Sequence, residues 1–271
     1  MIQNLSQIDA EQAPLSWQAQ LQDVITDVDE LCSILGLSSD CLKISRKGEH
    51  PFKFKVPRGF VARMTPGDAQ DPLLRQIIAL DDEFTEVPGF QNDPLAERAS
   101  NPVPGLLHKY NGRVLLLVTG TCSVNCRYCF RREFPYEKNN PGMLGWQKAI
   151  QAIQADESIH EVILSGGDPL VASDKLLVRL AEQLNAIPHL KILRIHTRLP
   201  VMIPARVTDS FIEWFTNLRL KPVMVIHANH ARELDADVLA ACSRLKAAGV
   251  TMLNQTVLLK GVNDRADTLD D

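Results

Sequence analysis

The sequence predicts an α/β fold in which parallel strands alternate with helices, preceded by a mainly helical accessory region. Three observations support this prediction. A cysteine cluster directly follows the first of several apolar runs, helical patterns separate the runs, and the last four runs begin about 30 residues apart. These runs are rich in β-forming residues and begin near Val114, Glu161, Ile192, Pro222 and Thr251. Strand–helix–strand units at this spacing imply a parallel sheet with right-handed crossovers.

The accessory region is predicted to span residues 1–105. Apolar residues recur at helical spacing over residues 17–35, which predicts one amphipathic helix that ends at Gly36. Prolines punctuate the stretch 38–105, within which we expect a short helix around Leu73–Leu80.

Residues 106–271 are predicted to form the main domain. Helical patterns lie between its strands at Leu144–Asp156, Asp174–Ile187, Thr208–Leu218 and Asp235–Ala248. A barrel or half-barrel of this kind collects its site at the carboxyl ends of its strands. The last residues, NDRADTLDD, look like the start of a further helix. We therefore expect the domain to be incomplete at Asp271, with at least one more strand to follow.

The composition is that of an ordinary soluble globular protein. Hydrophobic residues make up 45% and charged residues 23% of the 271 residues, and the net charge is −4. This balance gives no reason to expect nucleic acid or an anionic membrane as a partner. No apolar run approaches the ~20 residues of a membrane span, and the first residues, MIQNLSQIDAEQ, lack the pattern of a signal peptide. We expect a cytoplasmic protein, in a reducing compartment that suits free thiolates.

Three of the six cysteines, Cys122, Cys126 and Cys129, fall within eight residues with the spacing C-x3-C-x2-C. A structural zinc site requires four protein ligands, which usually come as two separated pairs. The sequence has no second C-x2-C pair. A 4Fe–4S cluster with three protein ligands leaves one iron open to a substrate or cofactor. We favour this cluster over zinc or a chance grouping. The other three cysteines are interpreted as buried or incidental thiols.

Polar residues follow the later strands at the same edge. Ser165-Gly166-Gly167-Asp168 comes after the second strand, where the glycines would let the backbone approach a ligand and Asp168 offers an acceptor. The next strands end in His196-Thr197-Arg198, His227-Ala228-Asn229-His230 and Asn254-Gln255. Singly, each group has a plain structural explanation as a tight turn, a core histidine or a cap. Together they predict one polar ring beside the cysteines. A three-histidine zinc site is disfavoured, because the cysteines already supply a metal site.

Basic residues flank the first strand and its cysteine loop. Lys109, Tyr110 and Arg113 come just before the strand and would suit a phosphate-bearing ligand near the barrel mouth. Solvated surface charge explains this group about equally well. Past the cysteines, Arg131 and Arg132 could pair with a carboxylate.

The cysteine spacing, with the aromatic Tyr128 before the last cysteine, resembles the signature of the radical S-adenosylmethionine (SAM) superfamily. Longer stretches are similar, in order and spacing, to lysine 2,3-aminomutases: PGLLHKYNGRVLLLVTGTCSVNCRYCFRREFPY, LSGGDPL, RIHTRLPV, HANH and NQTVLLKGVND. The stretches VPRGFVARMTPGD and DPLLRQ look most like the bacterial branch that supplies β-lysine for modifying elongation factor P. The resemblance runs from about Pro57 to the end of the chain.

The resemblance implies a partial (β/α)6 radical SAM barrel that uses a 4Fe–4S cluster, SAM and pyridoxal 5′-phosphate (PLP). It assigns the cluster to Cys122, Cys126 and Cys129. It places SAM near Tyr128, Gly166, Gly167, Asp168, His227 and Gln255. It places PLP near Lys109, Tyr110 and Arg113, with Lys109 in place of an arginine common in catabolic members of the family. Arg131 matches the residue that meets the substrate carboxylate.

The implied reaction converts L-lysine to β-lysine. An electron from the reduced cluster breaks SAM, the 5′-deoxyadenosyl radical takes hydrogen from the β-carbon of lysine, and the amino group moves from the α- to the β-carbon before hydrogen returns. The branch also implies a functional link to elongation factor P and its lysyl-transferring enzyme. A homo-oligomer is left open. Two alternatives remain: another radical SAM enzyme without PLP, such as an activase or methylthiotransferase, and a non-catalytic iron–sulfur protein used in sensing.

The family's PLP-anchoring lysine, and the acids that hold the ε-ammonium of the substrate, are expected beyond Asp271, so the PLP lysine is not present in this chain. We predict that the chain shows iron–sulfur absorbance after anaerobic reconstitution but no absorption band of lysine-bound PLP when PLP is added. Absorption spectra check both parts. A strong band of lysine-bound PLP would overturn the second.

Overall fold

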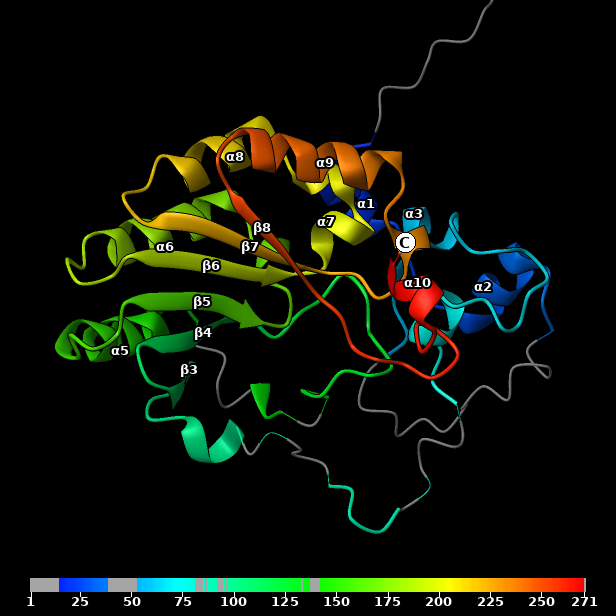
Figure 1. Cartoon of the computed structure of the whole chain (residues 1–271), viewed down its shortest axis with the longest axis horizontal. Coiled ribbons are helices and arrows are strands. Elements are labelled where there is room, and N and C mark those ends of the chain that lie inside the picture. The colour runs from blue at the N-terminus through cyan, green and yellow to red at the C-terminus, as the bar shows by residue number, and fades with distance from the viewer. Residues whose placement is uncertain are drawn as a thin grey trace, which may run out of the picture.

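The computed structural model describes residues 15–38, 53–80, 85, 87–91, 95, 97–132, 134–136 and 142–270, and it places a β-sheet beside a smaller, mainly helical region (Figure 1). Within these residues, six strands form the main sheet in the order β3-β4-β5-β6-β7-β8. Strands β4 to β8 are parallel, and β3 pairs antiparallel with β4 at one edge. The bounds are β3 Leu106–Tyr110, β4 Arg113–Thr119, β5 Glu161–Gly166, β6 Ile192–Thr197, β7 Lys221–His227 and β8 Thr251–Gln255.

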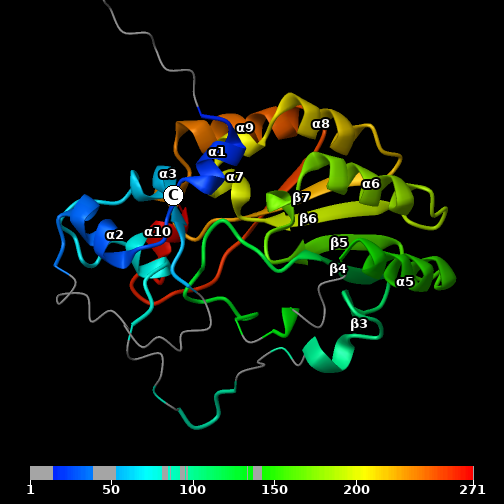
Figure 2. The same ribbon diagram turned by 180° about the vertical axis from the view of Figure 1, so that it is seen from behind.

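Helices cover one face of this sheet. Figure 2 shows α5 and α6 in front of the strands, whereas in Figure 1 the strands lie in front. The covering helices are α5 Gly142–Ala155, α6 Asp174–Asn185, α8 Asp209–Thr216 and α9 Ala236–Ala247. Alternate strand residues such as Val162, Leu164 and Ile195 share one fully buried core with Leu177 and Leu180 of α6. The predicted α/β class is confirmed, and the arrangement is that of a partial (β/α) barrel.

The main helices begin and end close to where the sequence predicts. The side chain of Thr208 caps α8 by accepting from the backbone N–H of Phe211, and that of Asp235 caps α9 by accepting from Val238. Gly249 follows α9 with a φ of 91°, a conformation that suits glycine after a helix. The helix expected at the end of the sequence is present as α10 (Ala266–Asp270).

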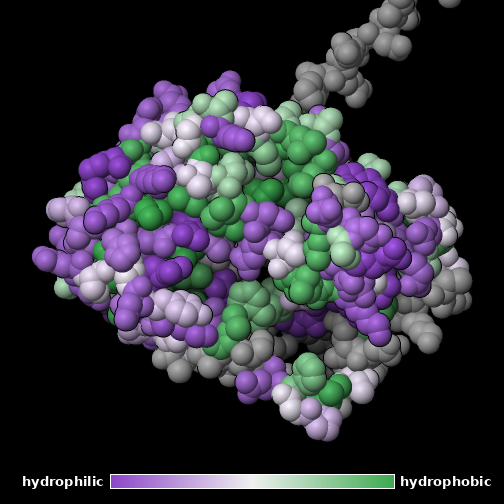
Figure 3. Space-filling view, viewed as in Figure 1, coloured by the Kyte–Doolittle hydropathy of each residue, from purple (hydrophilic) through white to green (hydrophobic). Residues whose placement is uncertain are grey.

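The other face of the sheet, called the inner face from here on, carries the remaining strand residues. Ser165, His196, His227 and Gln255 lie on it, toward the carboxyl ends of their strands. None of the described helices covers Leu253 of β8, which is 47% exposed. Figure 3, in the view of Figure 1, shows hydrophobic (green) side chains reaching the surface on this side of the molecule. The inner face is therefore exposed at β8, whereas Ser165 and Val225 on the same face are buried.

The accessory region is not built on the single helix predicted for residues 17–35, and that prediction is wrong. Two helices, α1 (Trp17–Gln22) and α2 (Val28–Leu35), are separated by the short strand β1 (Val24–Ile25). Strand β1 pairs antiparallel with β2 (Val56–Pro57). The two β-branched residues favour an extended backbone, and the pairing gives their backbone groups partners.

Helix α2 has well-defined ends. Asp27 caps its start by accepting from the backbone N–H of Asp29 at 2.9 Å. The predicted stop at Gly36 is confirmed by a left-handed φ of 64°.

The remaining elements are short. The helix expected around Leu73–Leu80 is a 3₁₀ helix, Leu74–Gln76. Its start is held by the fully buried Asp71, whose carboxylate accepts from the backbone N–H groups of Leu73 (2.8 Å) and Leu74 (3.1 Å). Helices α3 (Arg58–Val61) and α7 (Leu199–Met202) complete the described α-helices. Further 3₁₀ helices are Glu97–Ser100, Pro169–Val171, Pro204–Arg206 and Ala231–Glu233.

Strand β3 was not predicted. It forms a hairpin with β4 through Asn111-Gly112, where Gly112 has a φ of 77°. The division of the chain at residues 105 and 106 stays a prediction. Among the described residues, no helix has the length and apolar character needed to cross a membrane.

Candidate active site

The cysteine loop leaves the carboxyl end of β4, as predicted, and the accessory region holds it. The backbone N–H of Asn125 donates to the carbonyl of Lys55 (3.1 Å), and that of Arg127 donates to the carbonyl of Gln76 (2.9 Å). The Nζ of Lys55 donates to the carbonyl of Cys122 at 3.0 Å. These contacts fix the course of the loop.

The thiols of Cys122, Cys126 and Cys129 are free and half-buried, and their chemistry fits an iron–sulfur cluster. Burial, with nearby Asp168 and the other thiolates, raises the pKa of Cys122 well above its usual range, and burial next to Cys126 raises the pKa of Cys129 to about 11. Bound iron supplies the positive charge that thiolates in such a place need, since a coordinated thiol is deprotonated. Among the described residues, no three such ligands converge as they would around a single ion. A 4Fe–4S cluster instead takes its cysteine ligands on separate irons.

Gly166 and Gly167 bring the end of β5 against the cysteine loop. The backbone N–H of Gly167 donates to the carbonyl of Thr119 (2.6 Å), and that of Asp168 donates to the carbonyl of Thr121 (2.8 Å). A Cβ on Gly166 would lie 2.6 Å from the Thr119 oxygen, and one on Gly167 only 2.4 Å from the Thr121 oxygen. The close approach that the glycines were predicted to allow a ligand is therefore made to the chain itself. Their contact with SAM stays a prediction.

Asp168 is a buried carboxylate whose two oxygens are both engaged. Its Oδ1 accepts from the hydroxyl of Thr197 (2.6 Å) and the backbone N–H of Leu170 (3.0 Å), and its Oδ2 accepts from the backbone N–H of Arg198 (2.7 Å). Burial raises the pKa of Asp168, and these hydrogen bonds oppose the rise. The side chain thus ties the end of β5 to the end of β6. The predicted contact of Asp168 with SAM stays a prediction, and Oδ2, which accepts only one of these bonds, could accept a further donor.

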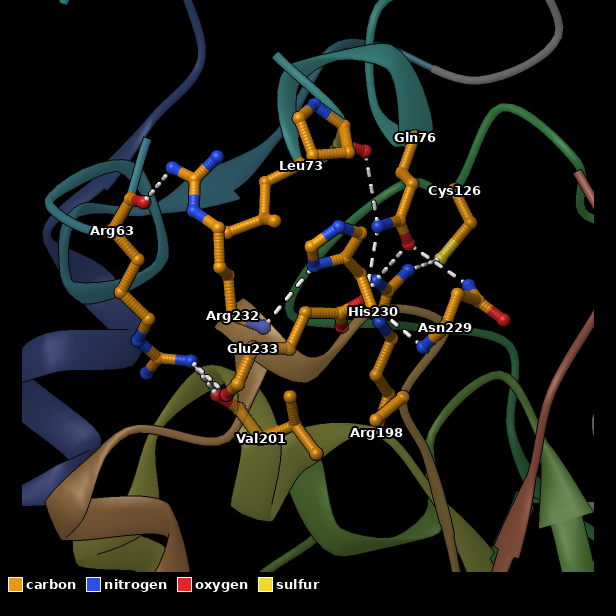
Figure 4. Close-up of polar contacts among 12 residues, drawn as sticks. Arg63, Leu73, Gln76, Cys126, Arg198, Val201, Asn229, His230, Arg232 and Glu233 are labelled. Atoms are coloured by element: carbon orange, nitrogen blue, oxygen red, sulfur yellow. Dashed lines mark hydrogen bonds and ion pairs between the residues drawn. The ribbon is translucent and has the colours of Figure 1, made fainter. Parts of the chain in front are cut away.

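A buried polar network joins the ends of β6 and β7 to the accessory region (Figure 4). The Nη2 of Arg198 donates to Glu233 Oε2 (2.9 Å) and to Gln76 Oε1 (2.7 Å). The Nδ2 of Asn229 donates to the same Gln76 oxygen (2.8 Å), and the Nε2 of Gln76 donates to Glu233 Oε1 (2.8 Å). Gln76 and Glu233 are fully buried. The network holds three segments that lie far apart in the sequence.

Arg198 also contacts the cysteine loop. Its Nη1 donates to the Sγ of Cys126 (2.9 Å) and to the hydroxyl oxygen of Tyr128 (2.6 Å), and its guanidinium lies 5.6 Å from the centre of the Tyr128 ring. Burial opposes the charged form, but Tyr128, Cys126 and Glu233 outweigh it and raise the pKa of Arg198 above its usual value. Arg198 is thus a fixed positive charge beside Cys126. The contact of Tyr128 with SAM stays a prediction.

His196, His227 and Gln255 meet on the inner face. The two imidazole rings lie edge to face with centres 5.9 Å apart, and His227 is in register with Gln255 across β7 and β8. Burial, aided by nearby arginines, lowers the pKa of His196 to about 4 and that of His227 to about 3, so both rings are neutral near pH 7. Within the described part of the chain, the buried Nε2 of each ring has no hydrogen-bond partner. A polar ligand on this face would satisfy them.

Arg131, expected to meet a substrate carboxylate, holds a carboxylate of the protein itself. Its Nε and Nη2 donate to Glu97 Oε2 (2.9 Å) and Oε1 (2.8 Å), and its Nη1 donates to Ser165 Oγ (3.0 Å). Burial opposes the charge on Arg131, but Glu97 raises its pKa. Because a guanidinium has five N–H groups, these bonds to described residues leave Nη1 and Nη2 one further donor each.

Lys109, Tyr110 and Arg113 lie together, but at the opposite end of β4 from the cysteine loop. Tyr110 and Arg113 are register partners where the β3–β4 hairpin begins, and the Lys109 Nζ and the Arg113 guanidinium lie 5.9 and 6.0 Å from the Tyr110 ring centre. The expected place near the barrel mouth is therefore wrong, because the hairpin puts these residues at the start of the strand, about 20 Å from its end. The Lys109 Nζ donates to the carbonyl of Leu95 (2.7 Å). The contact of these residues with PLP stays a prediction.

Sequence reasoning missed Gln76, Glu233 and Glu97, the residues that hold Arg198 and Arg131. Gln76 ends the stretch DPLLRQ, but that likeness gave it no role, and Glu233 and Glu97 lie in none of the quoted motifs. Only the fold brings these residues together, since Gln76 and Glu233 are 157 positions apart. A buried arginine at a strand end was the one available signal, since such a charge needs a buried partner.

Comparison with known proteins shows what the chain is similar to. A sequence profile of the radical SAM superfamily matches residues 116–271. Several curated proteins named L-lysine 2,3-aminomutase are similar over most of the chain. That of Escherichia coli strain K12 is 50% identical over 254 residues, covering 93% of this chain and 74% of that protein. That of Haemophilus influenzae is 47% identical over 254 residues (94% and 75%), and that of Clostridium subterminale is 36% identical over 257 residues (92% and 60%).

We predict that Gly167→Ala disturbs the cysteine loop. The added Cβ would lie 2.4 Å from the Thr121 oxygen, so a backbone segment must move, at a cost of about 1–3 kcal/mol. Gly59→Ala is the matched control, because its Cβ would lie 3.9 Å from the Met202 oxygen, an ordinary contact. Urea unfolding and the iron content after reconstitution check the two variants. Wild-type values for Gly167→Ala would contradict the role of this glycine.

The neutral histidines predict that stability depends on pH. The unfolded chain protonates His196 and His227 near pH 6.5, whereas the folded chain protonates them only near pH 4 and pH 3. The free energy of unfolding should therefore fall as the pH drops below about 6.5, by at most about 1.4 kcal/mol per pH unit for each ring and by less where solvent screens it. Denaturant unfolding from neutral pH to about pH 5 should show a shallower fall in H196Q/H227Q than in the wild type. Equal slopes would refute this.

Proposed function

The chain belongs to the radical SAM superfamily and, within it, to the lysine 2,3-aminomutase family, and on this premise we propose that it is an isomerase that converts L-lysine to β-lysine. One observation carries the proposal. The cysteine loop, Gly166-Gly167-Asp168 and the neutral pair His196 and His227 meet at the carboxyl ends of neighbouring parallel strands. A non-catalytic iron–sulfur protein would have no use for two buried Nε2 atoms, on the face beside its cysteines, that no described residue satisfies.

Cys122, Cys126 and Cys129 are proposed to hold a 4Fe–4S cluster and to leave one iron for SAM. When bound, the cluster and SAM supply a 5′-deoxyadenosyl radical that takes hydrogen from the β-carbon of lysine. The role of the protein is to hold SAM beside the open iron. The residues proposed for this are Tyr128, Gly166, Gly167, Asp168, His227 and Gln255.

His227 and Gln255 suit the orientation of a polar ligand. His227 stays neutral at physiological pH, and its buried Nε2 can make one hydrogen bond, for example to a sugar hydroxyl. A neutral ring adds no charge to the site. These residues are therefore proposed to position SAM rather than to transfer protons.

Arg131 is proposed to orient lysine through the substrate carboxylate. Glu97 and Ser165 fix the plane of its guanidinium, and the Nη1 and Nη2 donors that no described residue accepts would bind a second carboxylate. Glu97 partly neutralises the positive charge of Arg131. It should therefore weaken the binding of the substrate carboxylate while it keeps Arg131 in place.

Lys109, Tyr110 and Arg113 are proposed to bind the phosphate of PLP. When bound, PLP supplies a conjugated ring that spreads the unpaired electron while the amino group moves. By the alternation of residues along β4, Arg113 lies on the inner face, as His196 and His227 do. A ligand lying along this face would reach from Arg113 toward the strand ends.

We further propose that the β-lysine serves to modify elongation factor P, in concert with the enzyme that transfers a lysyl group to that factor. The likeness of VPRGFVARMTPGD and DPLLRQ to the corresponding bacterial branch supports this. We also propose the cytoplasm as the compartment, because thiolates that hold iron need reducing conditions.

The test is product formation after anaerobic reconstitution and reduction. This chain should cleave SAM to 5′-deoxyadenosine, and protein that also carries the PLP-anchoring lysine should form β-lysine from L-lysine in the presence of PLP. Cys126→Ala should form neither product. Arg131→Lys should still cleave SAM but should raise the KM for lysine at least about tenfold, because the two-pronged contact with the carboxylate is lost. Mass spectrometry measures both products.

Two outcomes would contradict the proposal in different ways. No 5′-deoxyadenosine from the iron-loaded chain would exclude a radical SAM enzyme. SAM cleavage without β-lysine, in protein that binds PLP, would favour a radical SAM enzyme of another kind.

A further inference from the structure

We propose that Arg198 is a positioning residue that raises the reduction potential of the cluster through its hydrogen bond to Cys126. The inference rests on the proposed 4Fe–4S cluster and goes beyond it, because it concerns how readily that cluster accepts an electron. The sequence marks Arg198 only as a polar residue that follows β6.

The guanidinium of Arg198 is held in one place. Its Nη1 donates to Cys126 Sγ (2.9 Å) and to the Tyr128 hydroxyl (2.6 Å), and its Nη2 donates to Gln76 Oε1 (2.7 Å) and Glu233 Oε2 (2.9 Å). These bonds use both terminal nitrogens fully. Arg198 is 5% exposed and Glu233 is 0% exposed. The contact with Cys126 is therefore a fixed feature of the fold.

The charges are ordered with the positive end toward the sulfur. Glu233 balances the charge of Arg198, but it bonds to Nη2, whereas Cys126 bonds to Nη1. The sulfur thus faces N–H groups, and the carboxylate lies behind them (Figure 4). Because these groups are buried, water and salt screen this arrangement weakly.

This order of charges favours the reduced cluster. A low-potential one-electron donor adds one electron, no bond forms or breaks, and the cluster with its thiolates gains one negative charge. A cationic N–H donor at a cysteine sulfur stabilises that added charge, and hydrogen bonds to the sulfurs are among the factors that set iron–sulfur potentials. Arg198 should therefore shift the potential upward, and Glu233 should oppose it.

Arg206 provides the comparison with a purely structural arginine. It is also fully buried, pairs with Asp174 (2.6 Å), and lies over the rings of Trp17 (4.5 Å) and Phe211 (4.9 Å). Its described contacts include no cysteine. If Arg198 only held the fold together, loss of either arginine would lower stability and leave the potential unchanged.

The test is the midpoint potential of the reconstituted cluster without SAM, from redox titration followed by electron paramagnetic resonance (EPR). The variant R198Q/E233Q removes both buried charges and leaves two amides that can pair, so no lone charge remains buried. Its potential should become more negative, with at least about a tenfold lower ratio of reduced to oxidised cluster at a fixed potential, or 59 mV for a one-electron couple. Glu233→Gln alone should shift the potential in the opposite direction. Arg206→Gln should leave it unchanged.

The opposite shifts distinguish this role from a loss of packing. An unshifted potential in R198Q/E233Q, at wild-type iron and sulfide content, would refute the inference, and so would shifts of the same sign in R198Q/E233Q and Glu233→Gln. If R198Q/E233Q binds no cluster, the shift in Glu233→Gln decides whether the inference holds: a more positive potential supports it, and an unchanged or more negative potential refutes it. A wild-type protein that binds no cluster would overturn the proposed function itself. The iron content of the wild type therefore distinguishes a failure of the proposed function from a failure of the inference about Arg198.

Discussion

The buried ion pair between Arg198 and Glu233 is the interaction on which the rest of the site depends. Its partners come from separate segments: Gln76 from the accessory region, Tyr128 from the cysteine loop and Asn229 from the end of β7. Removing Arg198 or Glu233 would leave the other charge buried without compensation, which costs about 3–5 kcal/mol. The hydrogen bonds of Arg198 to Cys126, Tyr128 and Gln76 link these segments, so the cysteine loop keeps its place relative to the strand ends. The accessory region, which carries none of the cysteines of the motif, is in this way part of the site.

Many polar groups near the cysteines serve the chain itself and not a ligand. Asp168 uses both carboxylate oxygens to tie β5 to β6, and the two glycines beside it make room for the backbone of the cysteine loop. Among the described residues near the cysteines, a smaller set remains for a ligand: the Nε2 atoms of His196 and His227, and further donors of Arg131. Many polar groups here thus make the site rigid, as the placing of a radical beside one carbon atom requires.

The parallel sheet and its covering helices could be predicted because hydrophobic periodicity reports them directly. The clustering of the site at strand ends followed from topology. The break at Val24 and Ile25 could not be predicted, because their partner strand, Val56–Pro57, lies far along the chain. The Asn111-Gly112 pair is a sequence signal for the β3–β4 hairpin. Because this signal was overlooked, Lys109, Tyr110 and Arg113 were predicted at the wrong end of β4. Glu233 and Glu97 had no local signal, and Gln76 had only the stretch DPLLRQ, which gave it no role. Only the fold brings the three to the arginines that they hold.

The central claim is that three cysteines on this loop hold a cluster with one iron open to SAM. The most direct test is the EPR spectrum of the reduced, reconstituted chain before and after SAM is added. An open iron predicts that SAM changes the spectrum, because it becomes a ligand of the cluster, while adenosine, which lacks the amino and carboxylate groups of SAM, leaves it unchanged. A cluster spectrum that is identical with and without saturating SAM would contradict the claim.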